Sequence, residues 1–170
     1  MNQRILSSIR DNIREKHNIW VNDEYSNCYM YALNIDMDIT KLDTGGYFRI
    51  GELCGLADNT KYSFDEIIYK DADELDIDLK EVSSDYNLKD DEWKIALFLG
   101  KNPDGHTEFH FCRQNPGEGW SHKNGWYQKI RYTDCLGKRI DDPSLAYMVS
   151  RRCTLTTYFD YVSTYKLKLK

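Results

Sequence analysis

The chain has 170 residues, of which 41% are hydrophobic and 14% aromatic, so it can bury one core and global disorder is excluded. This length predicts a single domain over residues 1–170. The formal net charge of −5 argues against a broad nucleic-acid interface, because phosphate binding requires a basic face.

The opening segment, residues 1–20, predicts a helix. Ile5, Ile9 and Ile13 recur at four-residue spacing, which is typical of the buried face of an amphipathic helix over residues 2–20. The segment has no apolar core of the kind found in secretory signal peptides. We therefore expect a packing helix here and a cytoplasmic chain, with release by lysis or by a signal-less route still open.

Two further helices are predicted before the middle of the chain. One begins near Cys28, with Ser26 or Asn27 as its N-cap. The other follows Ser63, which forms a capping-box pattern with Glu66.

Residues 71–92 carry ten acidic side chains. A calcium-binding loop beginning at Asp71 would need Gly at its sixth position and Glu at its twelfth, but the chain has Asp76 and Val82 there. We therefore expect a solvated acidic surface and no metal site.

The second half of the chain predicts strands separated by turns rich in Asn, Pro and Gly. The expected strands cover residues 93–99, 107–113, 120–123, 125–132 and 154–170, with a short helical turn over 143–149. Alternating lysines make the last strand resemble an edge strand. The apolar run over residues 95–99 is far short of the ~20 residues of a membrane span, so no membrane partner is expected. Helices followed by antiparallel strands predict an α+β fold.

One constellation could carry chemistry. Cys28 lies at the start of a predicted helix, where the dipole and the free backbone N–H groups favour the thiolate. On the predicted strand 107–113, His110 and Cys112 share a face. A turn centred near Pro116 would place His122 opposite His110. The pattern is consistent with a nucleophile, a base and a residue that orients the base.

Alternatives remain open for these residues. A single Cys or strand His is commonly structural, and Cys54, Cys112, Cys135 and Cys153 are interpreted as structural or incidental thiols. A metal site would draw on four side chains, His106, His110, Cys112 and His122. Neither this spacing nor the five cysteines, which form no CxxC pair, match a zinc knuckle or a disulfide framework. No metal and no cofactor are therefore expected.

Two blocks of the chain resemble a known superfamily. The first, Asn27-Cys28-Tyr29-x-Tyr31-Ala32-Leu33, resembles the nucleophile helix of papain-superfamily cysteine peptidases of the NlpC-like and CHAP-like type. The second block, Phe109-His110-Phe111-x-Arg113-Gln114-Asn115 followed by Gly119-Trp120-Ser121-His122-Lys123-x-Gly125, resembles a little-characterised bacterial and viral group within it. The resemblance covers about residues 25–145, and the Trp-Ser-His-Lys block is the more specific part.

The resemblance implies a papain-like (NlpC-like) fold in which a nucleophile helix packs on an antiparallel sheet. It implies Cys28 as nucleophile, His110 as base and His122 as third residue. Asn27 stands where many NlpC-like enzymes have Asp, and Cys112 replaces the tyrosine of the group. Asn27, Asn22 and Tyr25 are candidate oxyanion donors, and Trp120 is a candidate substrate contact.

The expected function is a thiol hydrolase, a cysteine peptidase or amidase, acting on a peptide, protein or peptidoglycan-type substrate. An alternative is a catalytically inactive papain-like binding or inhibitor module that uses Trp93, Trp120 and Trp126 as anchors. A further alternative is an acyltransferase with the same residues.

Overall fold

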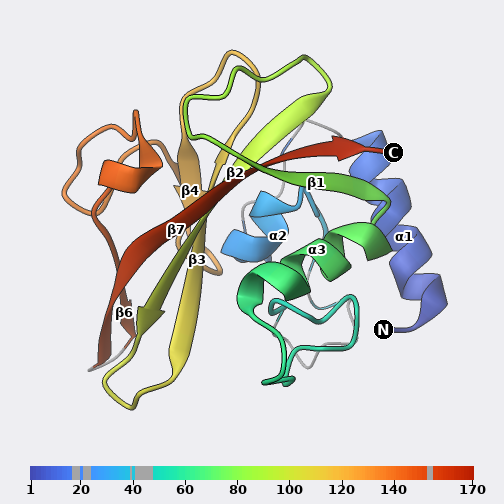
Figure 1. Ribbon diagram of the computed structural model, residues 1–170, viewed down its shortest axis with the longest axis horizontal. Coiled ribbons are helices and arrows are strands. Elements are labelled where there is room, and N and C mark those ends of the chain that lie inside the picture. Colours follow the sequence, from blue (N-terminus) through green and yellow to red (C-terminus); the bar gives the residue numbers. More distant parts are fainter. Residues whose placement is uncertain (17–19, 21–23, 39, 41–47, 153–154) are drawn as a thin grey trace.

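The computed structural model describes residues 1–16, 20, 24–38, 40, 48–152 and 155–170. In this part of the chain, N-terminal helices pack on a seven-strand antiparallel sheet, which confirms the α+β prediction (Figure 1). The helices are α1 (Gln3–Glu15), α2 (Cys28–Ala32) and α3 (Phe64–Glu74). The strands are β1 (Ile77–Val82), β2 (Glu92–Lys101), β3 (Thr107–Gln114), β4 (Ser121–Lys123), β5 (Ile130–Arg131), β6 (Met148–Arg152) and β7 (Leu155–Leu169).

The strand order is β1-β7-β2-β3-β4-β5, and β6 pairs with the first part of β7. The prediction of an edge strand at residues 154–170 is therefore wrong, because β7 lies between β1 and β2. Its Tyr165 and Leu167 are buried, while Lys166 and Lys168, which alternate with them, face away from this core. Alternating lysines follow one face of a sheet just as they follow an edge, so the sequence pattern does not separate the two.

Two hydrophobic clusters lie on opposite faces of the sheet. In β2, Ile95 and Leu97 pack in the cluster that includes the helices, whereas Ala96 and Phe98 pack in the second cluster. Burial on both faces explains why β2 reads as a continuous apolar run. In Figure 1 the three helices lie together on one side of the sheet.

The first and third helices form where the sequence predicts them. Ile9 and Ile13 of α1 are fully buried, but the helix ends at Glu15, short of the predicted end at residue 20. The capping box of Ser63 and Glu66 is present at the start of α3. Within the described ranges, none of the helices is long and apolar enough to cross a membrane.

The acidic segment is more structured than predicted. Residues Ile77–Val82 form β1, with Ile77 and Leu79 turned into the core. Asp71 and Glu92 are buried, so the expectation of a solvated surface is wrong for both. Each is held by several hydrogen bonds, which makes burial of a carboxylate tolerable.

Several elements of the second half match the prediction only in part. The predicted strand over 125–132 is reduced to β5, and the helical turn over 143–149 is a single 3₁₀ turn at Pro143–Leu145. Strand β6, which follows it, was not predicted. The turn at Asn102 closes as expected, with the Gly105 N–H donating to the Asn102 carbonyl.

Candidate functional site

Helix α2 begins at Cys28 because Asn27 caps it. The Oδ1 atom of Asn27 accepts hydrogen bonds from the backbone N–H groups of Tyr29 and Met30, at 3.1 and 3.0 Å. The Nδ2 atom of Asn27 donates to the carbonyl of Phe48. Asn27 is therefore the N-cap, which was one of the two predicted alternatives. Its side chain bonds the start of α2 and the carbonyl of Phe48.

Strands β3 and β4 hold α2 in place. The hydroxyls of Tyr31 and Ser121 lie 2.7 Å apart. The buried guanidinium of Arg113 donates from Nη1 to the carbonyl of Tyr31 and to Oδ1 of Asn34, at 3.1 and 2.7 Å. Since a cation near a helix C-terminus is favourable, these contacts fix the helix against the sheet.

Asp71 of α3 fixes the other side of α2. Its carboxylate accepts from the Tyr29 hydroxyl at 2.7 Å and from the backbone N–H groups of Gly51 and Cys54, at 2.6 and 2.9 Å. Burial raises the pKa of Asp71, although these donors partly oppose the shift. Burial, together with Asp71, raises the pKa of Cys54 to about 12, so this thiol stays protonated.

His110 of β3 and His122 of β4 are in direct contact. Both side chains are buried, and Nε2 of His110 lies 2.9 Å from Nδ1 of His122. On its other side, Nε2 of His122 lies 2.9 Å from the carbonyl oxygen of Thr133. A carbonyl only accepts, so His122 carries its proton on Nε2 and offers a lone pair at Nδ1. His110 must then donate from Nε2, which leaves its Nδ1 as the basic nitrogen.

The register that joins the two histidines differs from the prediction. Cys112, not His110, is the Cα partner of His122, and Arg113 pairs with Ser121. The turn is therefore centred on Gly117, which has a φ of 73°, and not on Pro116. A shift of two residues preserves the face of each side chain, so the diagonal pair still meets.

Both imidazoles are neutral at pH 7. Burial holds the pKa of His110 well below its usual range, and the neighbouring His122 adds to this. Burial also lowers the pKa of His122, while the hydrogen bond to Thr133 opposes the shift. A neutral His110 can accept a proton, which is the requirement for a general base.

Helix α2, which begins at Cys28, packs mainly on the face of the sheet opposite to the two histidines. Helix α2 packs on the face of β3 and β4 that carries Arg113 and Ser121, whereas His110 and His122 alternate to the opposite face. In the described residues β4 pairs with β3 only at Cys112 and Arg113, so the strands separate beside His110. The buried Cys112 has a raised pKa, caused mainly by burial, to which the Cys28 thiol contributes through space. The Cys28 thiol therefore lies near Cys112, the Cα partner of His122.

The other predicted site residues have different surroundings. Tyr25 is half-buried and its ring packs against Tyr127, with centroids 5.6 Å apart. Trp120 is 2% exposed and belongs to the second cluster, so it fills the core. Trp93 is also fully buried, whereas Trp126 lies at the surface. Asn22 lies outside the described residues.

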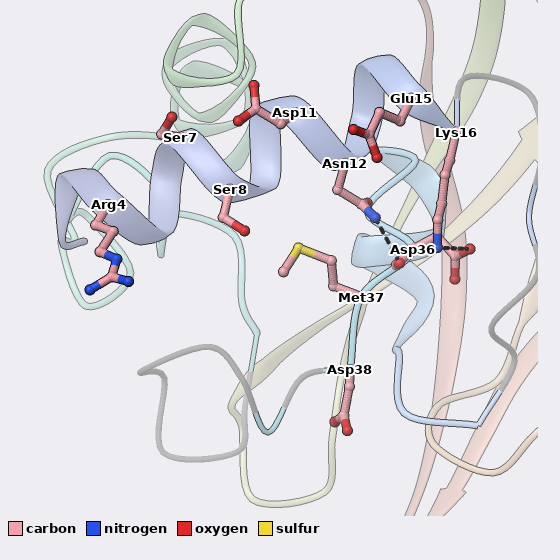
Figure 2. Close-up of a pocket in the computed structure, with 10 residues that line it drawn as sticks. All are labelled: Arg4, Ser7, Ser8, Asp11, Asn12, Glu15, Lys16, Asp36, Met37 and Asp38. Atoms are coloured by element: carbon pink, nitrogen blue, oxygen red, sulfur yellow. Dashed lines mark hydrogen bonds and ion pairs between the residues drawn. The ribbon is translucent and has the colours of Figure 1, made fainter.

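Two cavities are hollowed elsewhere in the described structure. Figure 2 shows the larger, of about 740 Å³, between α1 and the segment that carries Asp36 and Asp38. Asn12 of α1 and Lys16, just after the helix, both contact Asp36 across it. The smaller, of about 380 Å³, lies between residues 84–88 and 114–118. Neither is lined by Cys28, which is 8% exposed, or by the two histidines.

The four side chains of the alternative metal site, His106, His110, Cys112 and His122, do not come together in one cluster. His106 is exposed in a turn, apart from the buried pair His110 and His122. Over the ranges that the structure describes, no group of three or more His, Cys, Asp or Glu side chains could hold a metal ion.

Sequence reasoning missed two parts of this site. The acceptor that orients His122 is the backbone carbonyl of Thr133, and a backbone group leaves no side-chain signal. The turn that carries this carbonyl is held by the buried Asp134, which accepts from the N–H groups of Leu136, Lys138 and Tyr147. An acid followed by Gly137 was the available signal for such a turn.

Comparison with models of protein families, with curated proteins and with solved structures gives no significant match to this chain. The function is therefore inferred from the chemistry of Cys28, His110 and His122.

Proposed function

We propose that this protein is a papain-like thiol hydrolase, a cysteine peptidase or amidase, in which Cys28, His110 and His122 cleave an amide or related acyl bond. The observation that carries the proposal is the directed chain of hydrogen bonds from His110 through His122 to the Thr133 carbonyl. That chain leaves the basic nitrogen of His110 on the side away from His122, where a thiol would have to lie.

The reaction needs two proton transfers through His110. Nδ1 of His110 takes the thiol proton as the Cys28 sulfur attacks the acyl carbon. The imidazolium then gives this proton to the leaving amine, which leaves an acyl-enzyme thioester. A water molecule, deprotonated by His110, attacks the thioester, and Cys28 is released as a thiol.

His122 favours the charged form of His110 that appears during the reaction. Its Nδ1 lone pair accepts the N–H of His110, and this hydrogen bond strengthens when His110 becomes cationic. Burial holds the pKa of His110 low at rest, so His110 is available as a neutral base for the Cys28 proton. The start of α2 adds a favourable dipole for the thiolate.

The sequence resemblance supports the same assignment. The block with Cys28 is the start of α2. The two parts of the second block, which carry His110 and His122, fall on β3 and β4. An NlpC-like arrangement needs these three elements to be neighbours, and α2 does pack on both strands. The proposed substrates are peptides, proteins or peptidoglycan-type stem peptides.

One observation favours a second candidate function. Cys28 is buried, and neither described cavity opens onto it. A catalytically inactive module that binds a partner would keep such a closed arrangement without penalty. Acyl transfer would use the same residues as hydrolysis and differ only in the acceptor.

Site-resolved alkylation of the thiols separates these candidates. Iodoacetamide is applied over a range of pH to the wild type and to His110→Ala, and each cysteine is quantified by mass spectrometry. At about pH 6.5 an ordinary thiol of pKa near 8.5 is almost fully protonated and reacts slowly. We expect Cys28 to react at least about tenfold faster than Cys54 or Cys135, and we expect His110→Ala to remove this excess.

Cys135 is the internal standard, because its thiol is half-buried and lies outside the candidate site, whereas Cys54, whose pKa is raised to about 12, marks the rate of a protonated thiol. Cys28→Ser identifies the peptide that carries the fast reaction. If Cys28 reacts no faster than Cys135 in the wild type, the hydrolase proposal fails and the binding module takes its place.

A further inference from the structure

Exposed basic and aromatic side chains lie in the loop after β4, in β5 and in the turn after it, in segments that contact those of the candidate site. We call this set the basic–aromatic surface, and it consists of Trp126, Tyr127, Lys129, Arg131, Tyr132 and Lys138. Tyr127 is 66% exposed and Tyr132 50% exposed. Aromatic residues are enriched at protein interaction surfaces, where their rings supply contact area.

This surface is positively charged on a protein that is acidic overall. From Ser121 to Ile140 the one acidic residue is Asp134, which is buried and occupied by three backbone N–H groups. Among the described residues, no acidic side chain forms an ion pair with Lys129, Arg131 or Lys138. The exposed Glu24, whose carbonyl accepts from Tyr127, does not cancel the positive charges of Lys129, Arg131 and Lys138, so the local charge is opposite in sign to the net charge of −5.

The basic–aromatic surface contacts both segments that carry the candidate catalytic residues. The backbone N–H of Tyr127 donates to the carbonyl of Glu24 at 2.7 Å, and the Tyr127 ring packs on Tyr25, just before Cys28. Tyr127 has a φ of 58°, a left-handed conformation that a tyrosine adopts only under constraint. At the other end, Arg131 is the Cα partner of His122.

We propose that the basic–aromatic surface binds an acidic, aromatic-containing peptide segment of the substrate, adjacent to the bond that Cys28 attacks. This assignment rests on the proposed hydrolase function and names its substrate class. Carboxylates pair with the three cations, and aromatic side chains of the peptide pack on Tyr127 and Tyr132.

A peptide fits this surface better than a nucleic acid. Nucleic-acid interfaces neutralise many phosphates and lie on basic proteins, whereas this surface offers three unpaired cations on a chain of net charge −5. The neighbouring thiol and imidazoles carry chemistry suited to an acyl carbon.

Fluorescence anisotropy with a fluorescein-labelled random Glu–Tyr copolymer tests the proposal. The Cys28→Ser protein is used, so that no turnover occurs. The test variant combines Lys129→Glu, Arg131→Glu and Lys138→Glu. The control combines Lys61→Glu, Lys80→Glu and Lys101→Glu, which changes the net charge equally at exposed lysines elsewhere.

We expect the test variant to bind the copolymer at least about tenfold more weakly at about 50 mM NaCl, and the control to stay within about twofold. Binding should weaken at about 500 mM NaCl, and Tyr127→Ser with Tyr132→Ser should lower affinity further. Absence of binding, or equal loss in test and control variants, overturns the proposal.

Tighter binding of single-stranded oligothymidine than of the copolymer, lost in the test variant alone, also overturns it and assigns the surface to nucleic acid. The hydrolase proposal is tested independently by the alkylation of Cys28. An inert Cys28 together with copolymer binding that depends on the three cations removes the catalytic step and leaves the surface as a docking site.

Discussion

The imidazole rings of His110 and His122 meet edge to face, with Nε2 of the first 2.9 Å from Nδ1 of the second. The Thr133 carbonyl gives this contact its direction, because it requires the proton of His122 on Nε2. One backbone oxygen therefore sets the tautomers of two buried rings and decides which nitrogen of His110 is basic.

Removing the acceptor at His122 should impair Cys28. His122→Phe keeps a ring of similar size but offers no lone pair, so His110 loses its fixed tautomer and the partner of its charged form. We expect hydrolysis to fall by about 10² to 10⁴ and the fast alkylation of Cys28 to disappear. His106→Phe, in an exposed turn, serves as the control. Unchanged alkylation in His122→Phe would show that the histidine pair does not act on Cys28.

The stability of the protein should fall on mild acidification. Burial lowers the pKa of both His110 and His122 in the folded state, and unfolding restores values near 6.5. Below that pH the unfolded chain binds protons that the folded protein does not, so the free energy of unfolding decreases as pH falls. Between about pH 7.5 and pH 6 we expect a loss of about 1 kcal/mol.

Urea unfolding at a series of pH values measures this dependence. His110→Phe should flatten the profile over the same range, whereas His106→Asn should leave it as in the wild type. A wild-type free energy that stays constant or rises toward pH 6 is incompatible with two buried neutral imidazoles.

Asp134 should stabilise the turn that presents Thr133. Burial alone would raise the pKa of Asp134, but three backbone N–H donors more than offset this and lower it. Asp134→Ala leaves these donors without their acceptor, which should lower the free energy of unfolding by about 1 to 3 kcal/mol. The Nε2 proton of His122 should also lose its downfield NMR resonance, because the Thr133 carbonyl is no longer held.

Asp141→Ala is the matched control, since this carboxylate is exposed and belongs to the following loop. It should retain both the stability and the His122 resonance. If Asp134→Ala keeps a sharp downfield resonance for the His122 Nε2 proton, Asp134 does not contribute to the orientation of His122.

Two lysines of β7 should differ sharply in their contribution to stability. Lys166 lies 2.6 Å from the buried Glu92, whereas Lys168 lies 2.6 Å from the exposed Asp91. Lys166→Met leaves a buried carboxylate without its cation, and we expect a loss of about 1 to 3 kcal/mol in urea unfolding. Lys168→Met should have little effect, because both partners are solvated. Equal effects of the two substitutions would contradict the burial of Glu92.

Local patterns predicted much of the architecture. The spacing of Ile9 and Ile13, the Asn27 cap and the Ser63 capping box each depend on residues within one turn of a helix. The apolar run of β2 and the Asn-Pro turns likewise define strands from neighbouring residues. These patterns involve residues close together in sequence, so they can be interpreted without knowledge of tertiary contacts.

The failed predictions of an edge strand at residues 154–170 and of a solvated Asp71 both concern contacts between distant segments. The position of β7 inside the sheet depends on pairing with β1 and β2, far away in sequence. The burial of Asp71 depends on donors from Gly51 and from Tyr29 of another helix. Composition marks these acids as surface residues, and only their tertiary partners make burial favourable.

The candidate site divides in the same way. The sequence by itself determined an α+β chain with Cys28 at the start of a helix and with His110 and His122 on neighbouring strands, because caps, turns and strand alternation are local properties. The tertiary structure decided the register of Cys112 opposite His122, the diagonal contact of the two rings and the use of the Thr133 carbonyl. The register follows from the geometry of the turn at Gly117. The Thr133 carbonyl belongs to the backbone, which every residue has, so no residue type in the sequence identifies it as the acceptor.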